Sequence, residues 1–201
     1  MNEKEFRKRL RERLQRELGD EIELRDGRRV RVKVEMNKNL IYKVVVLPSL
    51  NNENFERQKI VFEPNNPREP RRGKYAFQTD LLIRREDDSL PLVAIEIKYR
   101  NLTTHHILTY STKAQEHKKI YPYLRYGLVI GGENRIPNRF FTHNIGFDFA
   151  YALNSVDDNI ENLADIIKKH IESANLLLQV LRRENQVKKF STIVELNESG
   201  R

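Results

Sequence analysis

The chain has 201 residues, of which 38% are hydrophobic and 33% charged, and one domain of this length buries roughly 70% of the surface of its extended chain. It has no cysteine, which excludes disulfide bonds, thiolate metal sites and a cysteine nucleophile. With 37 Lys and Arg against 29 Asp and Glu, the net charge is +8. Such a charge favours polyanionic partners, nucleic acid before an anionic membrane, although a basic protein without such a partner is the plainer alternative.

The start of the chain and its hydropathy bear on location. The charged residues 1–5 lead into no apolar segment, so we expect no secretory signal. No run approaches the ~18 apolar residues of a membrane span. We therefore expect a cytoplasmic protein that does not associate with membranes.

The first 74 residues predict a helix followed by strands. Residues 3–18 form a helix with one apolar stripe, which recurs every four residues at Phe6, Leu10, Leu14 and Leu18, and Gly19 ends it. Alternating and β-branched residues predict strands at 30–34, 40–47 and 59–62. Polar connections lie between them, and the one at 65–73 contains two prolines and a glycine, which is typical of a loop.

The chain from residue 74 onward predicts a core of strands with a helix between the second and third of them, followed by one or two further helices. We expect a strand at 74–83, a turn at 85–89, a strand at 91–99, a helix at 104–121 that ends before Pro122, and strands at 126–130 and 146–151. One or two helices follow at 157–184, and 191–196 could add a small strand. This order predicts an α/β fold in a single domain over 1–201, with its core at about 75–150, a helix and strands in 1–74 and a helical region at 155–201.

The hairpin of the two central strands brings two carboxylates together. A turn centred on Asp88 pairs residues whose numbers sum to 176, which places Asp80 opposite Glu96 on one face of the sheet. Lys98 projects from that same face. A register shifted by one residue would break this alignment, and the sequence alone does not fix the register.

Facing carboxylates between apolar runs repel each other, and a divalent cation removes the conflict. The two side chains of Asp80 and Glu96, the carbonyl of Ile97 and several waters suit octahedral Mg²⁺, with Mn²⁺ as a substitute. Such an ion activates water and neutralises charge on a phosphoryl group, and the Lys98 amine can orient the water or stabilise that charge. The alternative is an ordinary amphipathic hairpin with Glu96 and Lys98 on a solvated face.

The same residues carry a family resemblance. Asp80 followed by Glu96-Ile97-Lys98, with apolar flanks on both strands, resembles the PD-(D/E)xK nuclease superfamily, although Thr79 stands where the family name has proline. The resemblance covers residues 75 to about 150. It implies a restriction-endonuclease-like mixed central sheet flanked by helices, with Asp80 and Glu96 as metal ligands, Lys98 as the catalytic lysine, and Mg²⁺-dependent phosphodiester hydrolysis as the reaction.

Three residues are candidates for an accessory role. Gln115 and Lys118 share a stripe at the margin of the helix that follows the second hairpin strand, where many members of the superfamily have a polar residue, and a solvated helix edge is the alternative. Glu17 lies within the apolar arc of the first helix, and some members have a helix-borne glutamate at the metal. An ordinary glutamate at a helix end is the alternative there.

Basic residues gather around the hairpin. They precede the first strand, occupy the hairpin tip and follow the second strand, at Arg68, Arg71, Arg72, Lys74, Arg84, Arg85 and Arg100. Such residues contact phosphates and make nucleic-acid binding salt-dependent. We expect a Mg²⁺-dependent deoxyribonuclease, an endonuclease of restriction or repair and recombination type. The helical region at 157–184 is a candidate homodimer face, with packing on its own sheet as the alternative. A non-catalytic nucleic-acid-binding module and a protein–protein adaptor are the competing hypotheses.

Overall fold

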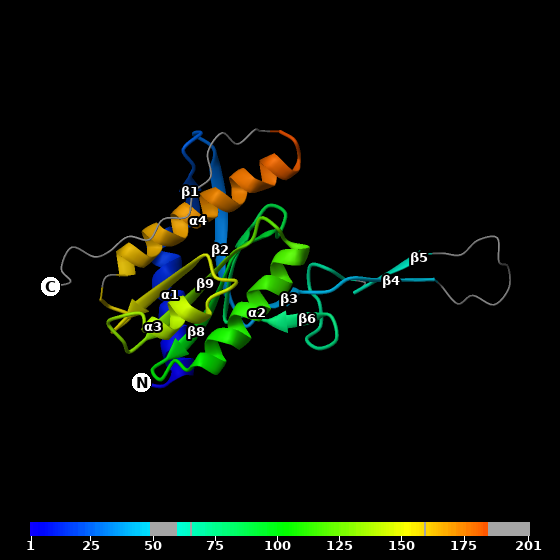
Figure 1. The fold of residues 1–201 in the computed structure, drawn as a ribbon. Coiled ribbons are helices and arrows are strands. Elements are labelled where there is room, and N and C mark those ends of the chain that lie inside the picture. Colours follow the sequence, from blue (N-terminus) through cyan, green and yellow to red (C-terminus); the bar gives the residue numbers. More distant parts are fainter. Residues whose placement is uncertain (49–59, 65, 159, 185–201) are drawn as a thin grey trace.

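A computed structural model describes residues 1–48, 60–64, 66–158 and 160–184, so the strand predicted at 191–196 lies outside the described residues. The fold is mixed α/β, with a curled six-stranded sheet in the order β1-β2-β7-β8-β9-β10 and helices on both of its faces (Figure 1). The strands are β1 (Glu21–Glu23), β2 (Arg29–Met36), β7 (Leu81–Arg85), β8 (Pro91–Tyr99), β9 (Arg125–Gly131) and β10 (Phe149–Leu153).

The type of strand pairing changes once across the sheet. The pairs β1–β2, β2–β7 and β7–β8 are antiparallel, whereas β8–β9 and β9–β10 are parallel. Helix α2 (Thr104–Ile120) makes the crossover from β8 to β9, as a parallel pair requires. The carboxyl ends of β8, β9 and β10 therefore meet at one edge of the sheet, and β7 begins at that same edge.

Helix α1 (Glu3–Leu18) confirms the prediction from the apolar stripe. Asn2 caps it by accepting a hydrogen bond from the backbone of Glu5, and such a cap contributes about 1 kcal/mol. All four stripe residues are buried. They pack, together with α4 (Ile160–Leu181), against one face of the sheet, and α2 covers the other face (Figure 1).

Alternation along β8 divides the core between these two faces. Val93, Ile95 and Ile97 belong to the cluster under α1 and α4, whereas Ala94 belongs to the cluster under α2. Each fully buried valine or isoleucine contributes about 1.5–3 kcal/mol. A one-residue slip would exchange the two sets and place Glu96 under α1 and α4, so packing fixes the register.

Two predicted strands are wrong in their extent, because the chain changes its pairing partner within each. The segment predicted at 74–83 divides into β6 (Ala76–Gln78) and β7, and the segment at 40–47 into β3 (Asn39–Ile41) and β4 (Val45–Pro48). β3 pairs with β6. The buried Thr79 ends that pairing, because its backbone N–H and its hydroxyl both donate to the carbonyl of Lys38, at 2.8 and 3.0 Å.

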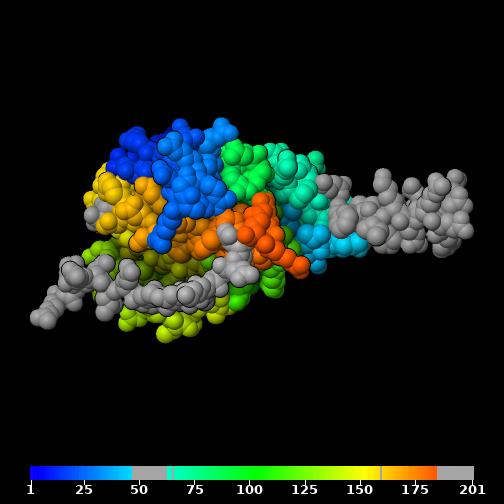
Figure 2. Space-filling model, turned by 90° about the horizontal axis from the view of Figure 1, so that it is seen from above, coloured from blue at the N-terminus to red at the C-terminus, as the bar shows by residue number. Residues whose placement is uncertain are grey.

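The outer elements differ in detail from the predictions. β4 pairs with β5 (Ile60–Glu63), and this two-stranded ribbon projects from the body of the molecule (Figure 2). β10 begins later than the predicted strand at 146–151, and a short helix, α3 (Asn138–His143), precedes it without a clear sequence signal. Among the described residues, no helix is long and apolar enough to cross a membrane.

Candidate functional site

The register of the β7–β8 hairpin confirms the predicted pairing. Leu81 lies opposite Ile95, Leu82 opposite Ala94 and Ile83 opposite Val93, and a register shift follows at Arg84. Asp80, immediately before β7, therefore lies across from Glu96 in β8. Both carboxylates stand at the edge where the parallel strands end, and α1 begins at the same edge (Figure 1).

Asp80 is held from two sides. Its Oδ2 accepts a hydrogen bond of 2.8 Å from the backbone N–H of Ile97, and its Oδ1 lies 2.9 Å from Nη1 of Arg7 in α1. Burial, and then the negative charge of Glu96, raise the pKa of Asp80 from 3.8 to about 6, although Arg7 and the Ile97 N–H act in the opposite direction. The two carboxylates are thus close enough to repel each other, as the sequence predicted.

Glu96 is almost fully buried, with 2% of its surface exposed. Its Oε1 accepts a 2.6 Å hydrogen bond from the hydroxyl of Tyr126 in β9 and lies 2.7 Å from Nζ of Lys113 in α2. Burial and then the charge of Glu96 raise the pKa of Tyr126 well above 10, so its hydroxyl stays a donor. Both of these contacts are made by Oε1.

Lys98 contacts a glutamate that the sequence analysis did not select. Its Nζ lies 3.1 Å from Oε2 of Glu3 in the first turn of α1, and the backbone N–H of Tyr99 donates to the same oxygen at 3.2 Å. Partial burial would raise the pKa of Glu3, but the Tyr99 N–H and Lys98 outweigh it and hold that pKa below 4.5. Glu3 therefore stays ionised and fixes the amine of Lys98.

Acidic and basic side chains alternate through the site. Arg7 lies between Glu3, at 3.7 Å, and Asp80, so α1 supplies both a carboxylate and a guanidinium. Lys113 donates to the carbonyl of Gln78 as well as to Glu96. A buried carboxylate is costly unless it is paired, and in this arrangement each of the carboxylates has a cationic neighbour.

The donor atoms fit Mg²⁺ in chemistry and number. The described residues contain no cluster of three or more His, Asp or Glu side chains that could hold a metal ion. Mg²⁺, however, usually binds through one or two carboxylates and keeps several waters. The N–H and C=O of a strand residue point to the same side, so the Ile97 carbonyl faces the side of Asp80. Asp80, Glu96 and Ile97 thus offer three oxygen ligands, while Lys113 and Arg7 neutralise the carboxylates as described.

The structure does not bring the three accessory candidates to the carboxylates. Gln115 donates to the carbonyl of Ile145, and Lys118 donates to the carbonyl of Gly146 at 2.7 Å and pairs with Asp148 at 2.8 Å. Glu17 lies near Arg13, about 15 Å along α1 beyond Arg7 at the usual rise per residue. From the same two helices, Lys113 contacts Glu96 and Glu3 contacts Lys98.

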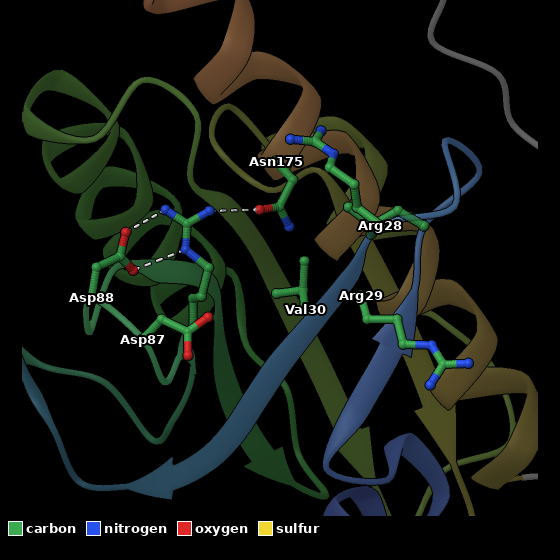
Figure 3. A pocket seen from close by; sticks show the side chains of 8 residues that line it. Arg28, Arg29, Val30, Asp87, Asp88 and Asn175 are labelled. Carbon is green, nitrogen blue, oxygen red and sulfur yellow. Dashed lines mark hydrogen bonds and ion pairs between the residues drawn. The ribbon is translucent and has the colours of Figure 1, made fainter.

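Two of the predicted phosphate contacts are engaged within the protein. Arg84 lies near Glu35 and donates to the carbonyl of Arg68. Arg85 pairs with Asp88 and donates to the side chain of Asn175 in α4 at 3.2 Å, on the wall of a pocket of about 200 Å³ at the far end of the hairpin (Figure 3). Among the described residues, neither guanidinium forms an ion pair with Asp80 or Glu96.

The other predicted contacts are exposed and form no ion pair with the described residues. They are Arg68, Arg71, Arg72 and Lys74 in the loop before β6, and Arg100 after β8. The guanidinium of Arg100 lies over the ring of Tyr99, 5.2 Å from its centroid, beside the end of β8 that carries Lys98.

Comparison with known proteins adds no family assignment. No protein-family model matches the chain, and no curated protein matches it.

Proposed function

We propose that the protein is a metal-dependent nuclease of the PD-(D/E)xK type, with a restriction-endonuclease-like fold. The observation that carries the proposal is the apposition of Asp80 and Glu96 across the β7–β8 hairpin, with Lys98 on the strand of Glu96. Burial, and then the charge of Glu96, raise the pKa of Asp80 to about 6. The mixed sheet with α1 on one face and the α2 crossover on the other supports the fold assignment. Asp80 and Glu96 serve as metal ligands in this proposal, together with the carbonyl of Ile97.

Each side chain then has a distinct task. Mg²⁺, when bound, activates water and neutralises charge on the phosphodiester. Tyr126 and Lys113 hold Oε1 of Glu96, and Glu96 would offer its other oxygen, Oε2, to the ion. Glu3 fixes the Lys98 amine at the edge of the sheet, where an ammonium group stabilises the negative charge that develops on the phosphate.

A second function is favoured by one specific observation. Lys113 and Arg7 already neutralise Glu96 and Asp80, as expected of carboxylates whose role is structural. On that basis the protein would bind nucleic acid without cutting it.

Cleavage of supercoiled plasmid separates the two functions. The wild type, Asp80→Ala and Lys98→Ala are incubated with Mg²⁺, Mn²⁺ or EDTA, and DNA binding is measured in EDTA by fluorescence anisotropy. Exposed Asp158, between β10 and α4, and exposed Lys33 in β2 supply matched alanine controls. Circular dichroism verifies that each variant is folded.

A nuclease predicts nicking in Mg²⁺ or Mn²⁺ but not in EDTA. We expect the cleavage rate of Asp80→Ala and Lys98→Ala to fall about 100-fold or more, while both variants keep their affinity for DNA. The control variants should cleave at the wild-type rate. Binding without cleavage by the wild type in either metal would favour the non-catalytic module. A protein that binds no nucleic acid at any salt concentration would exclude both functions and favour the protein–protein adaptor.

Substrate and assembly are further parts of the proposal. We propose DNA rather than RNA as the substrate, in the cytoplasm, and a homodimer through α4 for double-strand cleavage. RNA substrates in the cleavage assay and the mass in solution by light scattering test these points.

A further inference from the structure

Three exposed apolar side chains lie outside the carboxylate site on helices α2 and α3, which pack together, and on the turn after α3. We call this surface, with Leu108, Phe141 and Ile145, the seam. Leu108 is 43% exposed, Phe141 59% and Ile145 57%. Beneath them the seam is well ordered, because the Ser111 hydroxyl accepts from the N–H of Ile145 at 2.8 Å. Phe141 rests edge-on against the buried Phe140, at 5.4 Å between ring centroids. The packed support holds the Phe141 ring in place with most of its surface open to solvent.

The seam begins at the edge of the sheet that carries the carboxylates. Gly131, the last residue of β9, lies beside Tyr99, the last residue of β8. Residues 132–137 lead from there into α3, and Leu108 stands in the second turn of α2, whose chain leaves the same edge of β8. A polymer that crosses Lys98 can therefore continue along the seam.

The charge around the seam is positive. Arg135 and Arg139 flank the start of α3, both are exposed, and neither forms an ion pair with the described residues. Arg100 stands at the same edge, also without a carboxylate partner in the described part of the chain. An exposed aromatic ring on an element that also carries exposed arginines is an arrangement with which proteins bind unpaired nucleotides, because the ring stacks on a base and the guanidinium groups attract phosphates.

We propose that the seam binds unpaired bases, with Phe141 as the stacking platform, so that the substrate contains a single-stranded stretch next to the position of cleavage. This inference rests on the proposed function and specifies its substrate class. Bases within an intact duplex stack on one another and offer the ring no open face. A second copy of this chain fits less well, because a twofold contact through the seam would place Arg135 and Arg139 of both copies in one interface, and like charges at an interface repel.

Binding in EDTA tests the inference without any cleavage. Fluorescence anisotropy compares a labelled single strand with the matched duplex for the wild type, Phe141→Ala, Phe141→Tyr and Arg139→Gln. Val44→Ala is the control, because Val44 is 45% exposed between β3 and β4 and belongs neither to the seam nor to α4. A single strand carrying 5-iodouracil provides a second readout, since stacked aromatic residues crosslink to this base on irradiation.

We expect Phe141→Ala to weaken single-strand binding about 5- to 100-fold and duplex binding less than about twofold. Phe141→Tyr and Val44→Ala should bind like the wild type, and Arg139→Gln should reduce the slope of log K against log salt by about one. The crosslink should map to the peptide that contains Phe141.

Equal effects of Phe141→Ala on single strand and duplex, or no effect on either, would overturn the inference. Loss of self-association in Phe141→Ala, with single-strand binding intact, would assign the seam to a protein partner and overturn it as well. Metal-dependent plasmid cleavage by the wild type is measured separately, so the proposed nuclease can stand when the single-strand inference fails.

Discussion

At the scale of single residues, the ionisation of Asp80 links the site to folding stability. Its pKa is raised from 3.8 to about 6 in the folded protein by burial and by Glu96. Between these two values the folded chain retains a proton that the unfolded chain has lost. Stability therefore falls as pH rises through this range, which is the reverse of a carboxylate with a lowered pKa.

Asp80→Asn should stabilise the metal-free protein at pH 8, because the amide cannot ionise and still accepts from the Ile97 N–H. The shift of the Asp80 pKa sets the gain at about 1–3 kcal/mol, and the gain should vanish near pH 4. Urea unfolding in EDTA at pH 4, 6 and 8 measures it. The exposed Asp26, whose pKa is lowered by Arg28, supplies an Asp→Asn control without a gain. A less stable Asp80→Asn at pH 8 would mean that the Arg7 ion pair outweighs the repulsion.

Substitution of Glu3 tests whether this residue positions the amine of Lys98. Glu3→Gln removes the charge that holds Lys98 and leaves the backbone contact of Tyr99 available to the amide oxygen. We expect the cleavage rate to fall about tenfold or more, because a displaced group loses much of its effect, while plasmid binding in EDTA is unchanged. Glu5→Gln, in the same helical turn but exposed, is the matched control. Equal rates for the two variants would remove Glu3 from the site.

The sequence predicts part of this site, and physical reasons limit the rest. Asp80, Glu96 and Lys98 follow from the two-residue period of strands and from a turn centred on Asp88, which are local properties. Glu3 and Lys113 reach the site only because α1 and α2 pack on opposite faces at particular axial positions. Helical periodicity gives the face of a helix but not its position along the strand that it covers. Periodicity therefore favours Glu3 and Lys113 no more than Glu17, Gln115 and Lys118.

At the scale of elements, the closeness of α1 to β9 decides where Glu3 and Arg7 lie. A Cβ atom on Gly131 would lie 2.5 Å from Cζ of Phe6 in α1, which is far inside van der Waals contact. The missing side chain of Gly131 thus lets the first turns of α1 approach the carboxyl ends of the strands. The contact couples packing to the geometry of the site.

Gly131→Ala should destabilise the protein by about 1–3 kcal/mol through overpacking, and it should lower cleavage further by moving α1 away from Lys98 and Asp80. Urea unfolding and the plasmid assay measure the two effects. Adding Phe6→Leu frees space at this contact, so the double variant should lose less stability than the sum of the single changes. Additive losses would show that the alanine is accommodated without contact to Phe6.

The elements also show where sequence patterns fail for the fold. Residues 40–47 and 74–83 each have the residue pattern of a single strand, because strand propensity reports local fit to a sheet. It does not report which neighbour a strand pairs with. The change of partner at Thr79 depends on Lys38, about 40 residues earlier in the chain, and such a contact leaves no periodic signal.

At the scale of the whole molecule, the net charge of +8 does not act as one uniform surface. Some of its arginines balance nearby carboxylates, as Arg85 does with Asp88. Others, among them Arg71 and Arg72, are exposed and form no ion pair with the described residues. Counterion release depends on cations that reach phosphates, so the unpaired set rather than the total charge should control binding.

This division predicts opposite results for arginines only a short distance apart in sequence. Arg71→Gln and Arg72→Gln should each lower the slope of log K against log salt by about one and leave stability within about 0.5 kcal/mol. Arg85→Gln should keep the slope but lose stability, because Asp88 and the buried Asn175 lose their partner. Anisotropy titrations between about 50 and 200 mM KCl measure the slope. Urea unfolding measures the stability. A reduced slope for Arg85→Gln would mean that its ion pair opens on binding, and that the hairpin tip then contacts the nucleic acid.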